Sequence, residues 1–348
     1  MSKTLIVRYS QIGDALIAIP VINSLAKNYP NDEFTVLTNP IFAGIFSHMP
    51  KNVKLFPMIY RKKKHFLRGL IYLFDRYSLL LKIFFSEKYD HVALFQNGTF
   101  DDQLQFLLSK KKSQVVKIDL KEFRSKEKLK VTGFLETPSL SELYIKVLSQ
   151  LGYSHVKNEY DASCYKDEVI QLELLKKVQV NTGLKRIGIA PFSRLKPKIY
   201  PLEKMEEIIR YFSTRQDVQV LIFGGGDSEK AMAETWSENY ENVISLIGKL
   251  SFEEELYVIS SCEFILTMDS ANLHIASIVN TPAISIWGPS HPRLGYYPYN
   301  QLTENVVQQE IYCRPCSFFG ENPCTNPDLF ACMNILPETI IDKMNAAL

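Results

Sequence analysis

The sequence predicts an α/β protein made of two doubly wound halves, each built on a mostly parallel sheet. Short runs rich in β-branched residues alternate with helical patterns through the first half, and a second alternating series follows a less regular stretch at about 158–185. Such alternation is typical of βαβ units. The chain has 348 residues, which is long for one domain and ordinary for two.

Each half supplies five predicted strands. In the first half they are Leu5–Tyr9, Phe34–Leu37, Val53–Phe56, His91–Phe95 and Val115–Ile118; in the second they are Arg186–Ala190, Val218–Phe223, Val243–Leu246, Phe264–Met268 and Ala283–Trp287. Helices are predicted at Asp14–Lys27, Leu67–Phe85, Ser139–Leu151, Asp167–Val180, Leu202–Arg215, Ser228–Asn239, Phe252–Ser260 and Asn272–Val279. We expect an N-terminal domain over residues 1–165 and a C-terminal domain over residues 166–348, the latter including a Cys-rich segment at 313–332.

The composition is that of an ordinary globular protein, with 46% hydrophobic and 22% charged residues. The net charge of +2 is too small to indicate a nucleic-acid partner, and we expect none. The first strand is not followed by Gly-x-Gly-x-x-Gly, and the sequence has no Gly-x-x-x-x-Gly-Lys-Ser/Thr. A dehydrogenase and a P-loop ATPase are therefore disfavoured.

The N-terminus lacks a secretory signal, because Met1-Ser2-Lys3 runs directly into a first strand. The apolar stretch 66–85 carries four charged residues and fails the test for a membrane span, so we expect a cytoplasmic protein. A basic cluster, Arg61 to His65 with Arg68, precedes it. A solvated basic loop is the simpler explanation, and the alternative is a patch for anionic lipid or phosphorylated glycan at a membrane surface.

Polar residues follow the first strand where a ligand would bind. Gly13 allows close backbone approach as the next helix begins, and Asp14 would lie at the carboxyl end of the strand. Asp is also a frequent helix N-cap, and spacing alone slightly favours that role. The pair Asp101-Asp102 lies at another predicted helix start, so capping explains it better than a metal site does.

The loop after the first strand of the second half is rich in cations. It contains Ser193, Arg194, Lys196 and Lys198, which suit a diphosphate because cations neutralise its charge and the hydroxyl donates a hydrogen bond. An ordinary exposed loop has a similar composition. The sequence leaves both explanations open.

The next strand ends in a glycine triplet at 224–226, followed by Asp227 and Glu229. Glycines such as Gly225 let the backbone approach a ligand, and a carboxylate at this place can bind ribose hydroxyls. A tight turn between strand and helix explains the triplet equally well.

The strand Phe264–Met268 delivers small polar residues to the start of a helix. Ser270, Ala271 and Asn272 would expose free backbone N–H groups that suit phosphate. Asp269 is less expected as a phosphate contact, because like charges repel, and it either caps the helix or orients its neighbours. His274, in an apolar helix, is more often a packed histidine than a catalyst.

Four cysteines lie close together near the C-terminus: Cys313, Cys316, Cys324 and Cys332. In a reducing compartment this array favours a metal over disulfides, and a structural zinc ion is one explanation. Reduced cysteines in a Pro-rich loop are the other, because only the first pair has a familiar zinc spacing.

Four elements occur together and in a characteristic order. They are Gly13-Asp14-Ala15-Leu16 through Pro20, Lys198-Ile199-Tyr200-Pro201, the glycine turn at 224–226, and Met268-Asp269-Ser270-Ala271-Asn272-Leu273-His274-Ile275-Ala276. In this combination the sequence resembles glycosyltransferase family 9, the ADP-heptose:lipopolysaccharide heptosyltransferases. The resemblance spans the whole chain and is strongest in the C-terminal half.

The resemblance implies a GT-B fold of two Rossmann-like domains, with the acceptor bound by the N-terminal domain and the nucleotide sugar by the C-terminal one. It also implies an inverting transfer with no organic cofactor and no catalytic metal. Matched by position, Asp14 resembles the general base, Ser193 and Lys198 the diphosphate contacts, Asp269 with Ser270 and Ala271 the loop beside the donor phosphates, and Asp227 or Glu229 the ribose-binding carboxylate.

The implied partners are ADP-heptose as donor and an anionic, lipid-linked glycan of the lipopolysaccharide core as acceptor, met at the inner face of the inner membrane. Two elements depart from the family pattern: its Thr-Asp-Thr/Ser-Gly is Met268-Asp269-Ser270-Ala271 here, and its Lys-Arg/His-Trp-Pro is Lys198-Ile199-Tyr200-Pro201. A transferase or epimerase that uses a UDP- or GDP-sugar therefore stays open, as does a non-catalytic nucleotide or glycan binder.

Overall fold

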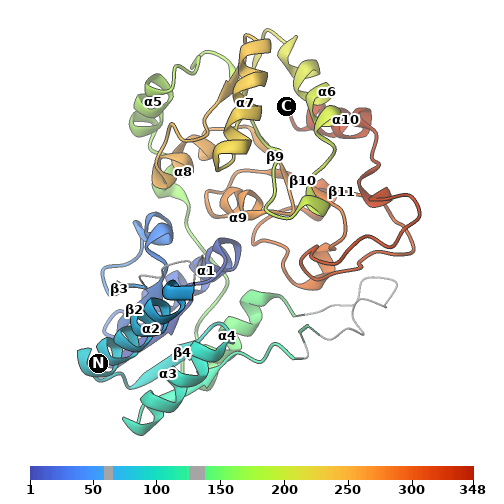
Figure 1. The fold of residues 1–348 in the computed structure, drawn as a ribbon. Coiled ribbons are helices and arrows are strands. Elements are labelled where there is room, and N and C mark those ends of the chain that lie inside the picture. Colours follow the sequence, from blue (N-terminus) through green and yellow to red (C-terminus); the bar gives the residue numbers. More distant parts are fainter. Residues whose placement is uncertain (59–65, 122, 125–137) are drawn as a thin grey trace. The chain divides into compact units, whose positions relative to one another are not determined.

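The computed structural model describes residues 1–58, 66–121, 123–124 and 138–348, with side chains of helix α2 described from Asp75 onward. The chain divides into two compact α/β units (Figure 1). The first contains the described residues of Met1–Phe123 and Pro138–Tyr160, and the second contains Arg124 and Asp161–Leu348. Each unit has its own sheet and its own apolar core.

The first unit has five parallel strands in the order β3-β2-β1-β4-β5. They are β1 (Lys3–Val7), β2 (Glu33–Thr38), β3 (Val53–Pro57), β4 (His91–Leu94) and β5 (Gln114–Lys117). Its helices are α1 (Ile12–Asn28), α2 (Phe66–Ser86), α3 (Thr99–Lys110) and α4 (Leu140–Gln150), with a 3₁₀ helix η1 (Pro40–Phe46). Helix α4 begins with a capping box between Ser139 and Glu142, which satisfies two backbone N–H groups at its start.

The second unit has six parallel strands in the order β11-β10-β9-β6-β7-β8. They are β6 (Lys185–Ala190), β7 (Val218–Ile222), β8 (Val243–Ser245), β9 (Phe264–Met268), β10 (Ala283–Trp287) and β11 (Val306–Gln308). Its α-helices are α5 (Glu168–Lys177), α6 (Leu202–Ser213), α7 (Asp227–Asn239), α8 (Phe252–Ser260), α9 (Ala271–Ile278) and α10 (Pro337–Ala347). Short 3₁₀ helices are η3 (Ser163–Tyr165), η4 (Lys196–Lys198), η5 (Pro292–Leu294), η6 (Thr303–Asn305) and η7 (Ala331–Met333).

Burial explains why the inner strands are continuous apolar runs. Every residue of β9 and β10 is buried, as expected of parallel strands covered on both faces. All ten predicted strands are present, with ends shifted by no more than two residues. The short strand β11 and helix α10 were not predicted; β11 has only three residues and follows a 3₁₀ turn, so it carries little periodic signal.

The strand orders place one topological switch point in each sheet. The order reverses between β1 and β4 in the first unit and between β6 and β9 in the second. In open α/β sheets, ligands bind outside the carboxyl ends of the strands at such a point. Among the described residues, no helix is long and apolar enough to cross a membrane.

The prediction that Asp101 and Asp102 cap a helix is wrong. Both lie in the first turn of α3, but Gly98 is the N-cap and makes no side-chain capping bond. Asp102 pairs with Lys117 at 2.6 Å, at the surface. Asp101 is buried and accepts a hydrogen bond of 3.2 Å from the amide of Gln96, and burial raises its pKa from 3.8 to about 6.

We expect Asp101→Asn to stabilise the protein at pH 8 by about 3 kcal/mol, because a carboxyl whose pKa is raised in the folded state costs stability once it ionises. The unfolded carboxyl ionises near pH 3.8 and the folded one near pH 6, so the wild type loses stability across that window. The variant's advantage should therefore grow between pH 4 and pH 6 and stay constant above it. Urea unfolding across this pH range measures it.

Asp102→Asn is the matched control, because it removes an exposed ion pair and should lower stability by no more than about 1 kcal/mol. An Asp101→Asn variant that is less stable than the wild type at every pH would show that the charged form of this carboxyl is needed in the fold.

Candidate functional site

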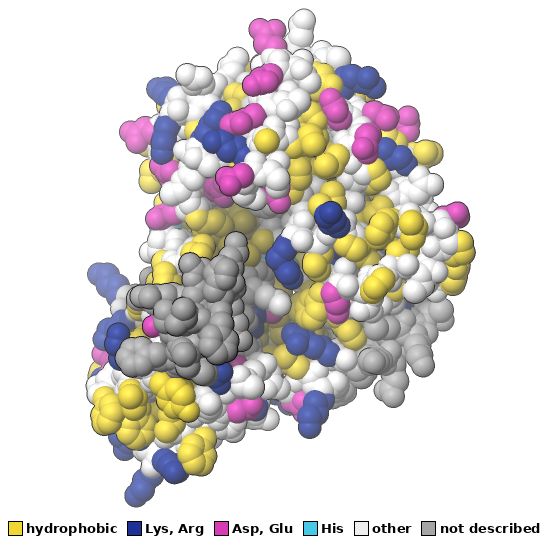
Figure 2. All heavy atoms as spheres, viewed as in Figure 1, with side chains coloured by type: hydrophobic (Ala, Val, Ile, Leu, Met, Phe, Trp, Pro, Cys, Tyr) yellow, Lys and Arg dark blue, Asp and Glu magenta, His cyan; other side chains and the backbone are white. Residues whose placement is uncertain are grey.

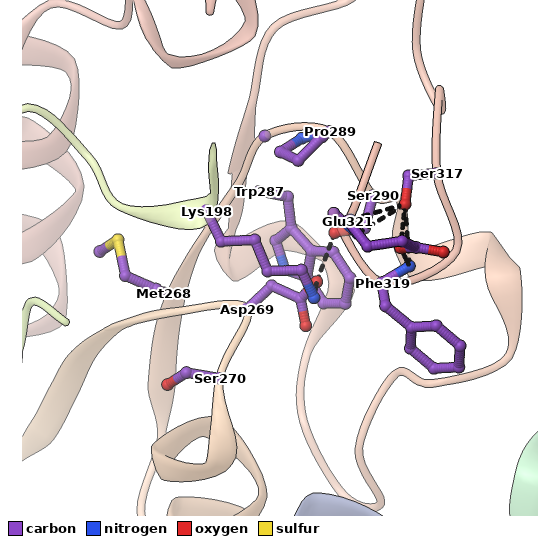
Figure 3. A network of polar contacts seen from close by, with 12 residues as sticks. Lys198, Met268, Asp269, Ser270, Trp287, Pro289, Ser290, Ser317, Phe319 and Glu321 are labelled. Carbon is purple, nitrogen blue, oxygen red and sulfur yellow. Dashed lines mark hydrogen bonds and ion pairs between the residues drawn. The ribbon is translucent and has the colours of Figure 1, made fainter. Parts of the chain in front are cut away.

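A buried ion pair occupies the switch point of the second sheet. Lys198 comes from η4, after β6, and Asp269 directly follows β9, which pairs with β6. Lys198 Nζ lies 2.6 Å from Asp269 Oδ2, and both side chains are only 10% exposed. The hydroxyl of Ser290, which follows β10, donates to the same carboxylate oxygen (Figure 3). Three neighbouring strand ends thus converge on one carboxylate.

Tyr200 fixes the position of the loop that carries Lys198. Its ring is fully buried in the core, and its hydroxyl donates to the carbonyl of Ile335 at 2.7 Å. Its backbone N–H points to the sulfur of Met268 at 3.4 Å, at the end of β9. The Lys-Ile-Tyr-Pro element is therefore anchored in the core by Tyr200, and it places Lys198 at the carboxyl ends of the strands.

A turn of the Cys-rich segment packs against the stem of Lys198. The Ser317 hydroxyl accepts from the N–H of Gly320 at 2.7 Å and donates to the Glu321 carboxylate. Gly320 has φ +79, and a Cβ there would lie 2.9 Å from Cγ and Cε of Lys198, so only glycine fits. Burial raises the pKa of Glu321, but hydrogen bonds and the Lys198 charge outweigh it, leaving that pKa below its usual value.

The start of α9 lies next to this ion pair in sequence and offers backbone donors. Ser270 is the N-cap, but its side chain makes no capping bond; its hydroxyl instead lies 3.3 Å from that of Thr267. Ser270, Ala271 and Asn272 are half-exposed. The first N–H groups of an α-helix have no partner within the helix, and they favour an anion. His274 is buried in α9, in agreement with a packed role.

The glycine turn after β7 is closed by Glu229. Its carboxylate accepts a hydrogen bond of 2.7 Å from the N–H of Gly225. A Cβ at Gly224 would lie 2.8 Å from that carboxylate, and Gly226 has φ +97, so both positions require glycine. Asp227 is exposed at the first position of α7. The structure therefore gives Glu229 a role in shaping the turn, and Asp227 remains accessible to a ligand.

Two further residues of the cationic loop, Ser193 and Arg194, were predicted to contact the diphosphate, and both lie upstream of η4. Ser193 is half-buried and Arg194 is exposed. Of the loop's cations, Lys198 alone is buried, while Arg194 and Lys196 extend into solvent.

The four cysteines line one small cavity, of about 20 Å³, together with Arg314 and Asn326. All four are free thiols, and burial raises the pKa of Cys332 to about 11. In the conformation described, no three His, Cys, Asp or Glu side chains of residues 1–58, 66–121, 123–124 and 138–348 are grouped closely enough to hold a metal ion. The structure brings the cysteines together without forming a coordination shell.

Asp14 lies at the switch point of the first sheet, in the first turn of α1. It is not the N-cap; that position is Gln11, whose side chain makes no capping bond, so the capping explanation is wrong. The Asp14 carboxylate instead forms an ion pair with the guanidinium of Arg8, and their side chains are 11% and 5% exposed. Gly13 precedes it, half-buried. A carboxylate held in this way can accept a proton from a group bound at the strand ends.

Arg8 and Ser290 were not predicted, although the sequence carries a signal for each. Arg8 directly follows the apolar run of β1 and is a charged residue at its carboxyl end, and Ser290 follows β10 by three residues. The strand-end argument that found Asp14 and Asp269 applies to both positions.

Comparison with known proteins places these features in a family. The model of glycosyltransferase family 9 (heptosyltransferase) matches residues 143–322, more than half of the chain. Lipopolysaccharide heptosyltransferase 3 of Escherichia coli is 26% identical over 287 residues, which cover 79% of this chain and 80% of that protein.

Two solved structures share the fold. E. coli heptosyltransferase WaaC with ADP has a TM-score of 0.68 at 18% identity, with 99% of this chain and 100% of that one covered. The iron-containing heptosyltransferase TibC, solved with ADP-D-β-D-heptose, has a TM-score of 0.55 at 11% identity, covering 99% and 76%. The resemblance and the GT-B fold inferred from the sequence are thus confirmed, and the chain belongs to glycosyltransferase family 9, the heptosyltransferases, and is a glycosyltransferase.

Proposed function

We propose that this glycosyltransferase transfers heptose from ADP-heptose to a glycan of the lipopolysaccharide core. The observation that carries the proposal is the buried Lys198–Asp269 ion pair at a topological switch point, beside the start of α9. The names of the relatives support the sugar and the acceptor, and the solved relatives with ADP and ADP-heptose support the nucleotide.

The second unit is proposed to bind the donor. Lys198 has three N–H donors and uses one on Asp269, so the others are available to the diphosphate. Ser193 and Arg194 in the same loop, with the N–H groups of Ser270, Ala271 and Asn272, complete the phosphate site. Gly225 and its neighbours allow the nucleoside to approach the backbone. Asp227 is the better candidate for the ribose, because Glu229 is already bonded to the turn.

The first unit is proposed to bind the acceptor and activate it through Asp14. Its carboxylate removes the proton from the acceptor hydroxyl as the oxygen attacks the anomeric carbon of the donor. The bond between that carbon and the β-phosphate oxygen breaks, and ADP leaves with the electron pair. A single displacement of this kind inverts the anomeric centre.

Lys198 and the N-terminus of α9 stabilise the negative charge that develops on the leaving diphosphate. Fixed cations and backbone donors can do what Mg²⁺ does in other transferases, so the proposed reaction needs no catalytic metal. Domain limits of 1–165 for acceptor binding and 166–348 for donor binding are part of this proposal.

The proposed acceptor is an anionic, lipid-linked glycan, so the enzyme would work at the inner face of the inner membrane. The basic residues 61–65 that the sequence associates with such a surface lie outside the described residues, and the side chain of Arg68 is not described.

A structural metal ion is proposed for the four cysteines. Their convergence on one cavity and the Cys313-x-x-Cys316 spacing support it, since thiolates at this spacing clamp a tetrahedral ion. The four thiols would have to move closer together on binding. The ion would tie down the segment that packs against Lys198 and would take no part in transfer.

Asp14→Asn should lower turnover with ADP-heptose by about 10²- to 10⁴-fold, because the base is lost, while ADP affinity stays within about twofold. Turnover is measured with a lipid-free core oligosaccharide as acceptor, and ADP affinity by calorimetry. Asp102→Asn, at an exposed carboxylate, is the matched control and should keep both.

Two results would contradict the proposal. Full turnover in Asp14→Asn would remove the assigned base. Thermal protection by UDP or GDP, but not by ADP, would assign the donor site to a different nucleotide sugar.

Protein purified without a histidine tag should contain about one zinc or iron ion per chain, measured by mass spectrometry, because four thiolates complete a tetrahedral site. Cys316→Ser should lose the ion and lower the melting temperature. Cys262→Ser, at a buried cysteine outside the segment, should keep it. Metal-free wild-type protein with full activity would leave these cysteines as ordinary loop residues.

A further inference from the structure

Helix α2 exposes an apolar strip that the proposed chemistry does not use. Tyr77, Leu81 and Phe85 are 59%, 53% and 74% exposed. Their spacing of four residues puts them on one face of the helix. The opposite face is buried, with Leu80 and Ile83 in the core, so packing fixes the direction in which the strip points. Tyr77, Leu81 and Phe85, called here the apolar strip, also line a shallow hollow on the surface.

Helix α3 lies alongside α2 and brings cations to the end of the strip. Arg76 donates to Gln103 at 2.9 Å, and further along Lys111 lies 4.4 Å from the ring of Phe84. Phe84 in turn contacts Phe85 edge to face. Lys111, which also donates to the Phe84 carbonyl, therefore lies near the Phe85 end of the strip, and its sequence neighbours Lys110 and Lys112 are exposed. Figure 2 shows hydrophobic side chains gathered in this region, with Lys and Arg side chains beside them.

The acidic residues nearby are already engaged. Glu87 pairs with Lys3 at 2.6 Å, and Asp90 accepts a bond of 2.9 Å from the Lys3 N–H. Asp102 pairs with Lys117 at 2.6 Å. Lys82 follows Leu81, lines the same hollow as the strip and is exposed. The strip thus combines exposed aromatic and aliphatic groups with a cationic border.

We propose that the apolar strip, with Lys82 and Lys110 to Lys112, docks on the surface of a bilayer that contains anionic lipids. This inference rests on the proposed function, in which the acceptor is linked to lipid. Amphipathic helices with aromatic and aliphatic residues on one side and lysines beside them bind such interfaces by apolar burial and electrostatic attraction. In a symmetric dimer packed through this strip, Lys82 of each copy would approach the lysines of the other copy. Repulsion between these like charges disfavours such a dimer.

Vesicle sedimentation of the full-length protein tests the inference. The wild type should bind vesicles of phosphatidylethanolamine and phosphatidylglycerol, bind phosphatidylcholine vesicles more weakly, and lose affinity as salt is raised. The double variant Leu81→Ser/Phe85→Ser should bind at least about tenfold more weakly, because two apolar side chains no longer leave water. Lys110→Gln/Lys112→Gln should weaken binding and flatten its salt dependence.

Leu302→Ser/Leu329→Ser is the matched control, because these leucines of the second unit are 60% and 71% exposed. It should bind vesicles like the wild type. The strip variants should keep the wild-type melting temperature and the turnover with a lipid-free acceptor, which separates this inference from the proposed function. Three results would each overturn the proposed docking surface. They are unchanged vesicle binding in Leu81→Ser/Phe85→Ser, no vesicle binding by the wild type, and a wild-type dimer that dissociates in this variant.

Discussion

The Lys198–Asp269 ion pair is the interaction on which the rest of the second unit depends. Burying two opposite charges costs desolvation free energy, which is offset only where geometry and further hydrogen bonds are good. Here Ser290 adds a bond to the carboxylate, Tyr200 anchors the loop, and Gly320 closes over the lysine stem. These contacts hold a cation at the strand ends before a ligand arrives, so little reorganisation is needed when charge develops there.

The Cys-rich segment belongs to the same structure. Its turn at Ser317 to Glu321 packs on Lys198, and Cys316 donates its N–H to the carbonyl of Pro289 at 3.0 Å, one residue before Ser290. Arg314 donates to the carbonyls of Gly288 and Ser290. A segment with little regular structure therefore holds the loop after β10, which carries Ser290.

The fold was largely predictable because its inner strands are buried on both faces and are punctuated by glycine and polar residues. Asp269 and Asp14 could be located because each directly follows a strand or opens the next helix. The strand-end positions of Arg8 and Ser290 were visible in the sequence, but their pairing with these carboxylates was not. Ser290 reaches Asp269 because β10 pairs with β9, and Arg8 reaches Asp14 through the path of the turn between β1 and α1. The capping explanations for Asp14 and Asp101 failed because both carboxylates turn inward to partners on other elements instead of back to their own helix.

A double-mutant cycle on ADP affinity tests most directly whether Asp269 acts by holding Lys198. Calorimetry would compare Asp269→Asn in the wild-type background and in a Lys198→Met background. If Asp269 works through the lysine, Asp269→Asn should weaken ADP binding by about tenfold in the wild type and by less than about twofold once Lys198 is absent. An equal loss in both backgrounds would show that the two residues act independently and would contradict the account.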